Sequence, residues 1–512
     1  MSQGHGHGRF APVKHVLLGL NGWDEHDYLV PHLDRFAGVL SNDVRLPANA
    51  DTHKALGTLA STFPSEQLAD SSIPAPYTYL GQFIDHDITL TVPVGNFNPD
   101  AELQKTPVTP VSPETLPRML RNRRTSAFDL DCLYGAQPEP GEEDLAVPFR
   151  GDKFVLGKVS AVGNRPPGKT DDNDLPRVAE GPRAKRARIG DPRNDENLIV
   201  AQLHLAFLKL HNAVVDDGHD FDHARRLVTQ HYQWLTITDF LPRICDPKVV
   251  RKVLTEGNKL YRPRHGEKYM PFEFAVAAYR FGHSMVRSDY DFNLNFKKNG
   301  GAQGKATFDL LFKFTGLKGD FFGQPTLPEN WIAQWEMLLK DRAMQIDPSL
   351  TPFLHTMPEG PIELMQQLAK RNLLRGYLFS LPTGQALASA VLSPPKRMSP
   401  QDILAGCRPE PATGIPNASP KSQRQIVEEL GLHKRTPLWL YILAEAKVKG
   451  GGNRLGPLGS LIVAETIIGL IRACRTSIMN QPFIPTLGQK PGRFDLQDML
   501  MKAGVLGARV PE

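Results

Sequence analysis

The segment 79–87 places a histidine between two aspartates, and its polar residues form the first group that could do chemistry. If the segment is helical, Gln82, Asp85 and His86 share one face by their i, i+3 and i+4 spacing, whereas Asp87 turns away. A neutral imidazole can take up a proton and return it near neutral pH, so His86 could act as a general base and then as a general acid. Taken alone, the same cluster is more typical of a hydrogen-bonded helix end.

A second polar group, in residues 190–197, leads directly into the apolar stretch 198–211. Asp191 or Asn194 can cap the helix predicted there, and acidic residues in a first turn suit the helix dipole. Capping does not explain Arg193, whose permanent charge could stabilise negative charge that develops during a reaction.

A third segment, 277–286, carries one histidine in apolar surroundings. Arg280 and His283 are predicted to share a helical face, and Gly282 leaves room for the close approach of a flat or bulky group. A single histidine on an apolar helix is one way in which proteins hold haem iron, but alone it is a weak signal.

In series, these three segments resemble the animal-type haem peroxidases of the peroxidase–cyclooxygenase superfamily. The shared patterns are G-Q-x-x-D-H-D, D-x-R-x-x-E-N and R-x-G-H, and the resemblance covers about residues 77–390. It implies a haem b cofactor, with His283 as the iron ligand and with His86 and Arg193 on the opposite, distal side. It also implies an enzyme that reduces hydrogen peroxide through an oxoferryl intermediate and then oxidises halides, thiocyanate or small phenolic donors.

The resemblance assigns further residues to the side of the haem that carries the iron ligand. A metal-bound histidine needs a partner on its other ring nitrogen, and the resemblance implies that Asn372 is the acceptor that orients His283. Arg375, three residues further on, matches an arginine that pairs with a haem propionate. Arg280, beside His283, is counted among the cofactor-binding residues.

Other matched residues concern the distal side. Gln82 matches a glutamine associated with halide binding. Asp85 and Glu196 match two carboxylates that form ester links to haem methyl groups in the covalently modified members. Whether the links form depends on the position of the haem and on turnover with peroxide, so the sequence leaves this open.

Residues 124–135 resemble the family's calcium loop. The oxygen ligands implied are the side chains of Asp87, Thr125, Asp129 and Asp131 and the carbonyl of Ala127, a set that suits a hard cation. A turn rich in aspartate, with no metal, is the alternative interpretation.

Two other functions remain open on the same fold. The fatty-acid dioxygenases and cyclooxygenases of the superfamily carry a tyrosine three residues before the iron-binding histidine, where this chain has Arg280, with Tyr279 one step further away. This difference favours a peroxidase. A non-catalytic adhesion or structural protein is less favoured, because it would have no use for His86 and Arg193 above an iron held by His283.

The elements that must position these residues are mainly helical. Helical periodicity occurs in residues 198–215, 224–240, 272–286, 362–379, 425–430, 438–446 and 460–475. Strand-like alternation is scarce, and the 44 prolines fall mainly between the helical windows. We therefore expect a mainly α fold with long irregular connections and little β structure, in which residues 1–70 form an N-terminal extension around a helical domain of residues 71–512.

Composition excludes several function classes. A net charge of +5 over 512 residues is too weak to indicate nucleic-acid binding. The four cysteines are too widely spaced for a zinc motif or a disulfide framework. The most apolar late run, residues 459–474, contains charges and is too short to span a bilayer, and the first residues lack a signal-peptide pattern. We expect a soluble protein, cytoplasmic or exported without a cleaved signal peptide, whose oligomeric state the sequence leaves open.

Overall fold

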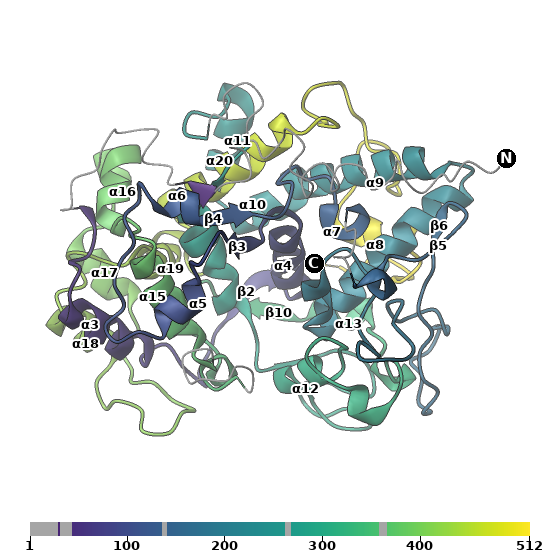
Figure 1. Ribbon diagram of the computed structural model, residues 1–512, viewed down its shortest axis with the longest axis horizontal. Coiled ribbons are helices and arrows are strands. Elements are labelled where there is room, and N and C mark those ends of the chain that lie inside the picture. The colour runs from purple at the N-terminus through teal and green to yellow at the C-terminus, as the bar shows by residue number, and fades with distance from the viewer. Residues whose placement is uncertain (1–28, 31–43, 136–140, 262–267, 358–365, 512) are drawn as a thin grey trace.

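The computed structural model describes residues 29–30, 44–135, 141–261, 268–357 and 366–511 (Figure 1). Helices dominate these residues, which confirms the predicted mainly α fold with long connections. The α-helices are α3 (Ala50–Ala60), α4 (Pro76–Ile88), α5 (Pro99–Leu103), α6 (Leu116–Met119), α7 (Asp131–Tyr134), α8 (Leu198–Asp216), α9 (Phe221–Leu235), α10 (Leu241–Ile244), α11 (Pro247–Glu256), α12 (Phe308–Lys313), α13 (Trp335–Lys340), α15 (Leu368–Leu378), α16 (Gly384–Val391), α17 (Pro400–Gly406), α18 (Gln423–Glu429), α19 (Leu438–Gly450), α20 (Pro457–Ala473) and α21 (Leu496–Lys502).

The strands of the described residues are short and form two-stranded pairs. Parallel pairing joins β1 (Leu29–Val30) to β7 (Met270–Pro271). The antiparallel pairs are β2 (Asp70–Pro74) with β10 (Arg342–Met344), β3 (Thr91–Pro93) with β4 (Leu120–Asn122), β5 (Phe149–Arg150) with β6 (Lys153–Phe154), and β8 (Asp289–Tyr290) with β9 (Ala306–Thr307). In the β2–β10 pair, Arg342 lies opposite Pro74. The backbone N–H of the next residue, Ala75, donates to the backbone carbonyl oxygen of Asp341 at 2.9 Å. This pair therefore fixes the point at which α4 begins.

Helix α4 lies near the middle of the molecule, between the α8–α9 side and the α15–α17–α19 side (Figure 1). It packs against α8, and α8 packs against α9 and α21. Phe83 of α4 stacks on Phe207 of α8, with ring centroids 4.5 Å apart, and both side chains are fully buried. These contacts make α4 a rigid support for the polar residues on its other face.

The predicted helical window 272–286 is helical but not α-helical. It consists of a π-helical segment, η6 (Glu273–Ala277), followed by a 3₁₀ segment, η7 (Ala278–Met285). The change of winding falls at Ala277, whose φ of −131° and ψ of −70° lie outside the helical region. In a 3₁₀ helix residues three apart lie directly above one another, so Arg280 and His283 still share a face.

The predicted window 224–240 also changes winding. Helix α9 ends at Leu235 and is followed by a π-helical segment, η5 (Thr236–Phe240), before α10 begins. π-helical turns inside longer helices are found frequently at functional sites. Here the π turn lies against α4, with the ring of Phe240 within 3.4 Å of the position that a Cβ at Gly81 would take.

Helices α19 and α20 support the segment that carries His283. Glu445 of α19 is fully buried, and its carboxylate accepts hydrogen bonds from the backbone N–H groups of Leu458 and Gly459 at the start of α20. Trp439 of α19 donates its indole N–H to the carbonyl oxygen of Arg280 at 3.2 Å. The α19–α20 pair is therefore bonded directly to η7.

Helix α3 contributes to the same hydrophobic core. It packs against α15, and its Leu56 is fully buried. Phe63, just after the helix, is also fully buried, and its ring stacks on Trp439 with centroids 4.9 Å apart. The predicted domain boundary after residue 70 stays a prediction. Most of the predicted extension, residues 1–28 and 31–43, lies outside the described residues.

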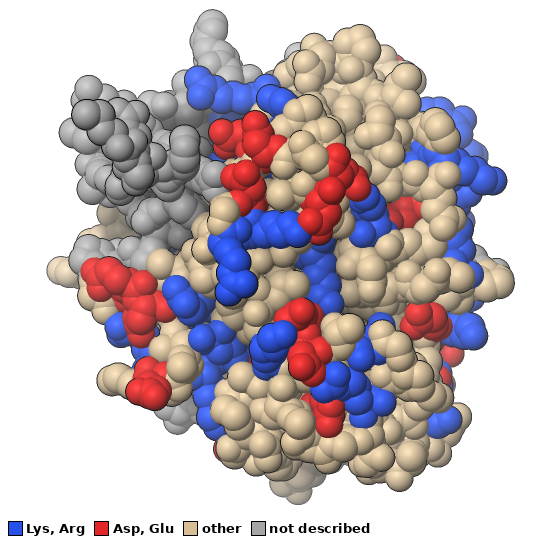
Figure 2. Space-filling model, turned by 90° about the vertical axis from the view of Figure 1, so that its right-hand side faces the viewer, with Lys and Arg blue, Asp and Glu red and all other residues tan. Residues whose placement is uncertain are grey.

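One described helix, α8, is long and apolar enough to cross a membrane by length and composition, and 78% of its most apolar window is buried inside the protein. On the face drawn in Figure 2, basic and acidic side chains lie beside one another. Basic residues 183, 185, 186 and 188 lie close together in the sequence, and two of them are engaged in the fold: Arg183 pairs with Asp144 at 2.9 Å, and Lys185 donates to the carbonyl oxygen of Asp320.

Candidate active site

A cavity of about 380 Å³ is lined by residues of α4 and η7, and the histidines of the first and third polar segments are both among its lining residues. His86 stands on α4 and His283 on η7. The other residues predicted for the site that line the cavity are Gln82, Asp85, Glu196 and Arg280. The fold therefore brings together residues that are up to 201 positions apart in the sequence, counted from Gln82 to His283.

His86 is held by a chain of hydrogen bonds on the side away from the cavity. Its Nδ1 lies 2.8 Å from Oδ1 of Asn194, whose Nδ2 lies 3.0 Å from Nδ1 of His204. Because an amide oxygen only accepts, Nδ1 of His86 carries the proton and Nε2 is left as the basic atom. Burial and the charge of Arg193 lower the pKa of His86 to about 3. The imidazole is therefore neutral at neutral pH and able to accept a proton.

Arg193 lies beside His86 but is turned toward an aspartate. Its Nη2 donates to the carbonyl oxygen of His86 at 3.1 Å, and its Nε and Nη2 both donate to Asp191, at 3.0 and 2.6 Å. Burial disfavours the charged form of Asp191, but the charges of Arg193 and Arg124 hold its pKa well below the usual range. Arg193 is thus anchored next to His86, and it is not among the residues that line the cavity.

Helix capping around Arg193 is divided between two residues. Asp191 caps the 3₁₀ turn η4 (Pro192–Asp195), where its side chain accepts from the backbone N–H of Arg193. Asn197 caps α8, where its side chain accepts from Ile199. The expectation that Asp191 or Asn194 caps the helix starting at Leu198 was therefore wrong, because Asp191 caps the preceding 3₁₀ turn and the Asn194 side chain bridges His86 and His204.

On η7, His283 contacts Asn372 of α15. Nδ1 of His283 lies 2.8 Å from Nδ2 of Asn372, and Oδ1 of Asn372 accepts from Nη1 of Arg280 at 2.9 Å. The predicted pair is therefore in contact, but the atom of Asn372 that faces the ring is the nitrogen. Burial, followed by the charges of Arg280 and Arg371, lowers the pKa of His283, so the ring is neutral.

Three arginines gather near His283. Burial and the charge of Arg375 lower the pKa of Arg280 to about 9, and burial and the same neighbour lower the pKa of Arg371. Arg375 pairs with Asp100 of α5 at 2.5 Å, whereas Arg280 and Arg371 line the cavity. This wall of the cavity is therefore strongly cationic and favours an anionic group.

We compared the amino-acid sequence with models of known protein families. Residues 102–383 match the family model described as animal haem peroxidase, and this match includes Arg193, His283 and Asn372. The chain belongs to the animal haem peroxidase family. The segment with His86 precedes the matched residues.

Curated relatives of the family match part of the chain. A peroxidase-like protein from Margaritifera margaritifera is 30% identical over 277 residues, which are 43% of this chain and 33% of that protein. Myeloperoxidase from Mus musculus is 24% identical over 315 residues, 50% of this chain and 42% of its own length. The chain thus matches less than half the length of either relative.

Solved structures with the same fold include two kinds of enzyme. Peroxidase A from Dictyostelium discoideum superposes with a TM-score of 0.58 at 16% identity, over 94% of each chain. The fatty acid alpha-dioxygenase of Oryza sativa superposes with a TM-score of 0.55 at 14% identity, over 92% of this chain and 84% of that one. At these identities the likeness shows the peroxidase fold alone.

The residues around the cavity fit the haem that the family implies. His283, on η7, offers an imidazole of the type that binds haem iron. Arg280 and Arg371 offer buried positive charge for two propionates. If Arg280 bonds a propionate, the oxygen of Asn372 is released and the amide can turn to accept from His283, the orientation that iron binding through Nε2 requires.

Two carboxylates of the site have different surroundings. Glu196 accepts from Nε2 of Gln82 at 2.8 Å, and its Oε1 lies 3.8 Å from Nε2 of His86. Asp85 is half-buried, and burial raises its pKa despite the charges of Arg193 and Arg280. Both carboxylates face the cavity, where the predicted ester links would have to form.

The predicted calcium loop places its carboxylates close together. Burial and the charges of Asp129 and Asp131 raise the pKa of Asp87 to about 8. Thr125 donates its hydroxyl to Asp129 at 2.8 Å, and Arg124 donates to Asp131 at 3.2 Å. Within the described ranges no three His, Cys, Asp or Glu side chains are arranged as a metal site. The negative charges of Asp87, Asp129 and Asp131 lie close enough to raise the pKa of Asp87, and a bound cation would offset their repulsion.

Sequence reasoning missed two residues of the site. Asn194 was visible inside the second motif, next to Arg193, but only its contact with His86 across 108 positions shows its role. Arg371 stands one helical turn before Arg375 on α15, and this spacing was the one signal that it shares a face with the predicted propionate ligand.

Proposed function

We propose that the protein is a haem-dependent peroxidase that reduces hydrogen peroxide and oxidises halides, thiocyanate or small phenolic donors. The observation that carries this proposal is that two neutral histidines, His86 on α4 and His283 on η7, line one cavity, with Nε2 of His86 left as a base by Asn194. A bound haem would be held by His283 through the iron and by Arg280 and Arg371 through its propionates, and it would supply the redox chemistry.

The other steps belong to side chains of the protein. Nε2 of His86 takes the proton from hydrogen peroxide and later returns it to the oxygen that leaves as water. Arg193, held beside His86 by Asp191, supplies positive charge where negative charge develops as the O–O bond breaks. Asp191 holds the guanidinium beside His86.

Three finer assignments complete the proposal. Gln82, bonded to Glu196 at the cavity wall, contributes an amide N–H for a halide donor. Asp85 and Glu196 are the two carboxylates that would form any ester links to a bound haem. Calcium binds between Asp87 and the 125–131 loop and stabilises the end of α4 that carries His86.

One observation favours a second candidate, a fatty-acid dioxygenase. Tyr279 lines the cavity, and its buried hydroxyl has no hydrogen-bond partner in the described part of the chain. Arg280 stands in the place of the tyrosine on which such enzymes depend, so a dioxygenase would have to use a residue in a different position on η7.

The test compares two reactions of the protein reconstituted with haemin. A peroxidase oxidises guaiacol or iodide when hydrogen peroxide is added, and His86→Leu removes most of this activity. Oxygen uptake with a polyunsaturated fatty acid, in the absence of added peroxide, would establish the dioxygenase instead. A protein that takes up no haemin would contradict both.

A further inference from the structure

Three tyrosines line the cavity between His86 and His283, and their hydroxyl groups have different partners. Tyr77 donates to Oδ2 of Asp239 at 2.6 Å. Tyr79 donates to the hydroxyl of Tyr290 at 2.7 Å. Tyr279 has no hydrogen-bond partner among the described residues. Of these three phenols, Tyr77 is the one whose proton faces a carboxylate.

The partner of Tyr77 belongs to a compact polar cluster. Oδ1 of Asp239 accepts from Nε of Arg243 at 2.7 Å, and Oδ2 also accepts from the backbone N–H of Leu496 at 3.0 Å. The guanidinium carbon of Arg243 lies 4.6 Å from the centroid of the Tyr77 ring. Asp239 is thus held by three donors in one orientation, with the charge of Arg243 beside it.

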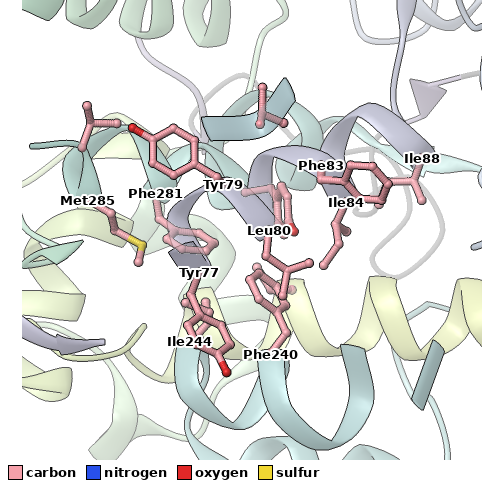
Figure 3. Close-up of a cluster of buried hydrophobic side chains, with 14 of the residues drawn as sticks. Tyr77, Tyr79, Leu80, Phe83, Ile84, Ile88, Phe240, Ile244, Phe281 and Met285 are labelled. Atoms are coloured by element: carbon pink, nitrogen blue, oxygen red, sulfur yellow. The ribbon is translucent and has the colours of Figure 1, made fainter. Parts of the chain in front are cut away.

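The cluster extends from the cavity wall toward the surface. Tyr77 is 2% exposed and Asp239 8%, whereas the side chain of Arg243 is 26% exposed. In Figure 3, Tyr77 points away from α4 toward Ile244, and Tyr79 points to the opposite side. Asp239 is supplied by the π-helical segment η5, a type of turn that is frequent at functional sites.

Simple chemistry distinguishes Tyr77 from the other two tyrosines. A phenol that loses an electron becomes a very strong acid, so its oxidation proceeds readily only where a base takes the proton. Burial, together with the charge of Asp239, raises the pKa of Tyr77, so the phenol is protonated before any oxidation. Tyr77 must therefore lose its electron and its proton together, and Asp239 is in place to accept the proton.

We propose that Tyr77 is a redox relay, which carries one oxidising equivalent from the haem cavity to the surface near Arg243 while Asp239 holds the phenolic proton. The inference rests on the proposed peroxidase function. Tyr77 transfers one electron to haem that hydrogen peroxide has oxidised. Its O–H bond breaks, and the proton moves to Oδ2 of Asp239, which leaves a neutral phenoxyl radical and a carboxylic acid.

An external donor then completes the cycle. A phenol at the surface supplies one electron to the Tyr77 radical and releases one proton to water, and the proton on Asp239 returns to the Tyr77 oxygen. Because electron transfer needs proximity but no entry into the cavity, this route serves phenols that are too large to enter it. Polymer-bound and protein-bound phenols are the substrate class.

The experiment is freeze-quench electron paramagnetic resonance of the haemin-reconstituted full chain after addition of one equivalent of hydrogen peroxide. The wild type gives a tyrosyl radical, identified by the narrowing of its signal when the protein carries ring-deuterated tyrosine. The radical, expressed per bound haem, is lost in Tyr77→Phe and retained in the matched variants Tyr79→Phe and Tyr279→Phe. Asp239→Asn, which keeps the size of the side chain but not the base, also loses the radical.

The outcomes separate this inference from the proposed function. If the haem absorption of the wild type does not change with peroxide, the peroxidase proposal fails, and the relay fails with it. If the haem reacts but the radical is absent, or persists in Tyr77→Phe, or disappears equally in all three tyrosine variants, the relay is overturned and the peroxidase proposal stands. A radical that survives at full yield in Asp239→Asn overturns the role of that carboxylate.

Discussion

Nδ1 of His86 and Oδ1 of Asn194 lie 2.8 Å apart, and this contact leaves Nε2 of His86 as the basic atom of the ring. The two residues come from segments 108 positions apart, α4 and the turn before α8. Asn194 is itself held by His204. The tautomer of the distal histidine is therefore determined by packing between two helices, and its loss should be measurable.

Replacement of Asn194 tests this relationship. Asn194→Ala removes the acceptor, so His86 can carry its proton on either nitrogen, and we expect the second-order rate constant for the reaction with hydrogen peroxide to fall roughly 100-fold. Stopped-flow absorbance of the haem measures this rate. Asn194→Asp keeps an acceptor and is expected to retain the rate at neutral pH. An unchanged rate in Asn194→Ala would show that the contact does not orient His86.

The pH dependence of the same rate tests the environment of His86. Protonation of Nε2 removes the base, so the rate falls as pH drops through the pKa of His86. Burial and Arg193 lower that pKa from 6.5 to about 3, so we expect the rate constant to stay level from neutral pH down to about pH 4. An acid limb centred between about pH 6 and pH 7, as for an ordinary histidine, would contradict the buried, neutral imidazole.

Arg193 is expected to act on the reaction rather than on cofactor binding, because it does not line the cavity. Arg193→Gln removes the charge beside His86, and we expect the peroxide rate constant to fall about 100-fold to 1000-fold while haemin affinity changes little. Arg183→Gln, at an exposed ion pair with Asp144, serves as the control and should have the wild-type rate. A large loss of haemin affinity in Arg193→Gln would assign the residue to the cofactor instead.

Arg371 and Arg375 make a matched pair one helical turn apart. Arg371 lines the cavity, whereas Arg375 is paired with Asp100. We therefore expect Arg371→Ala to weaken haemin binding by about 10-fold or more, because a charge-assisted hydrogen bond to a propionate is lost, and Arg375→Ala to weaken it less. Haemin titration followed by absorbance measures both. If Arg375→Ala weakens haemin binding more than Arg371→Ala does, Arg375 is the propionate ligand, as the sequence predicted.

Calcium binding is expected to depend on pH through Asp87. Without a cation, burial and the charges of Asp129 and Asp131 raise the pKa of Asp87 to about 8, so binding at neutral pH must displace a proton. Calcium affinity should therefore rise as pH increases toward about 8 and level off above it, with proton release detectable by calorimetry in two buffers.

Chelation provides the complementary measurement. We expect a calcium chelator to lower the melting temperature of the wild type and to have no effect on Asp129→Asn. The surface variant Asp51→Asn should respond as the wild type does. If neither calcium nor the chelator changes the melting temperature of the wild type, the proposed calcium site is contradicted.

Part of this site could be predicted because its chemistry lies in short motifs. His86, Glu196 and His283 stand in compact patterns that point to chemistry when they occur in series, and all three line the cavity. Helix α8 begins at Leu198, where the apolar periodicity begins, because its buried face is continuous over five turns. Local patterns and tertiary packing agree in these places.

The rest depends on contacts that no local pattern encodes. Over the short window 272–286, π, α and 3₁₀ winding place apolar residues in similar positions, so periodicity did not reveal the change at Ala277. The sequence of α15 does not distinguish Arg371 from Arg375, whereas the fold pairs Arg375 with Asp100, 275 residues away, and leaves Arg371 at the cavity. The orientation of Asn372 likewise depends on Arg280, 92 residues away.

The most direct test of the central claim is a haemin titration of the wild type and of His283→Ala, followed by absorbance and magnetic circular dichroism. We predict that the wild type binds one haem with the spectrum of a histidine-ligated iron, that His283→Ala loses this spectrum, and that added imidazole restores it. A wild type that takes up no haemin, or a His283→Ala protein whose spectrum equals that of the wild type, would contradict the account.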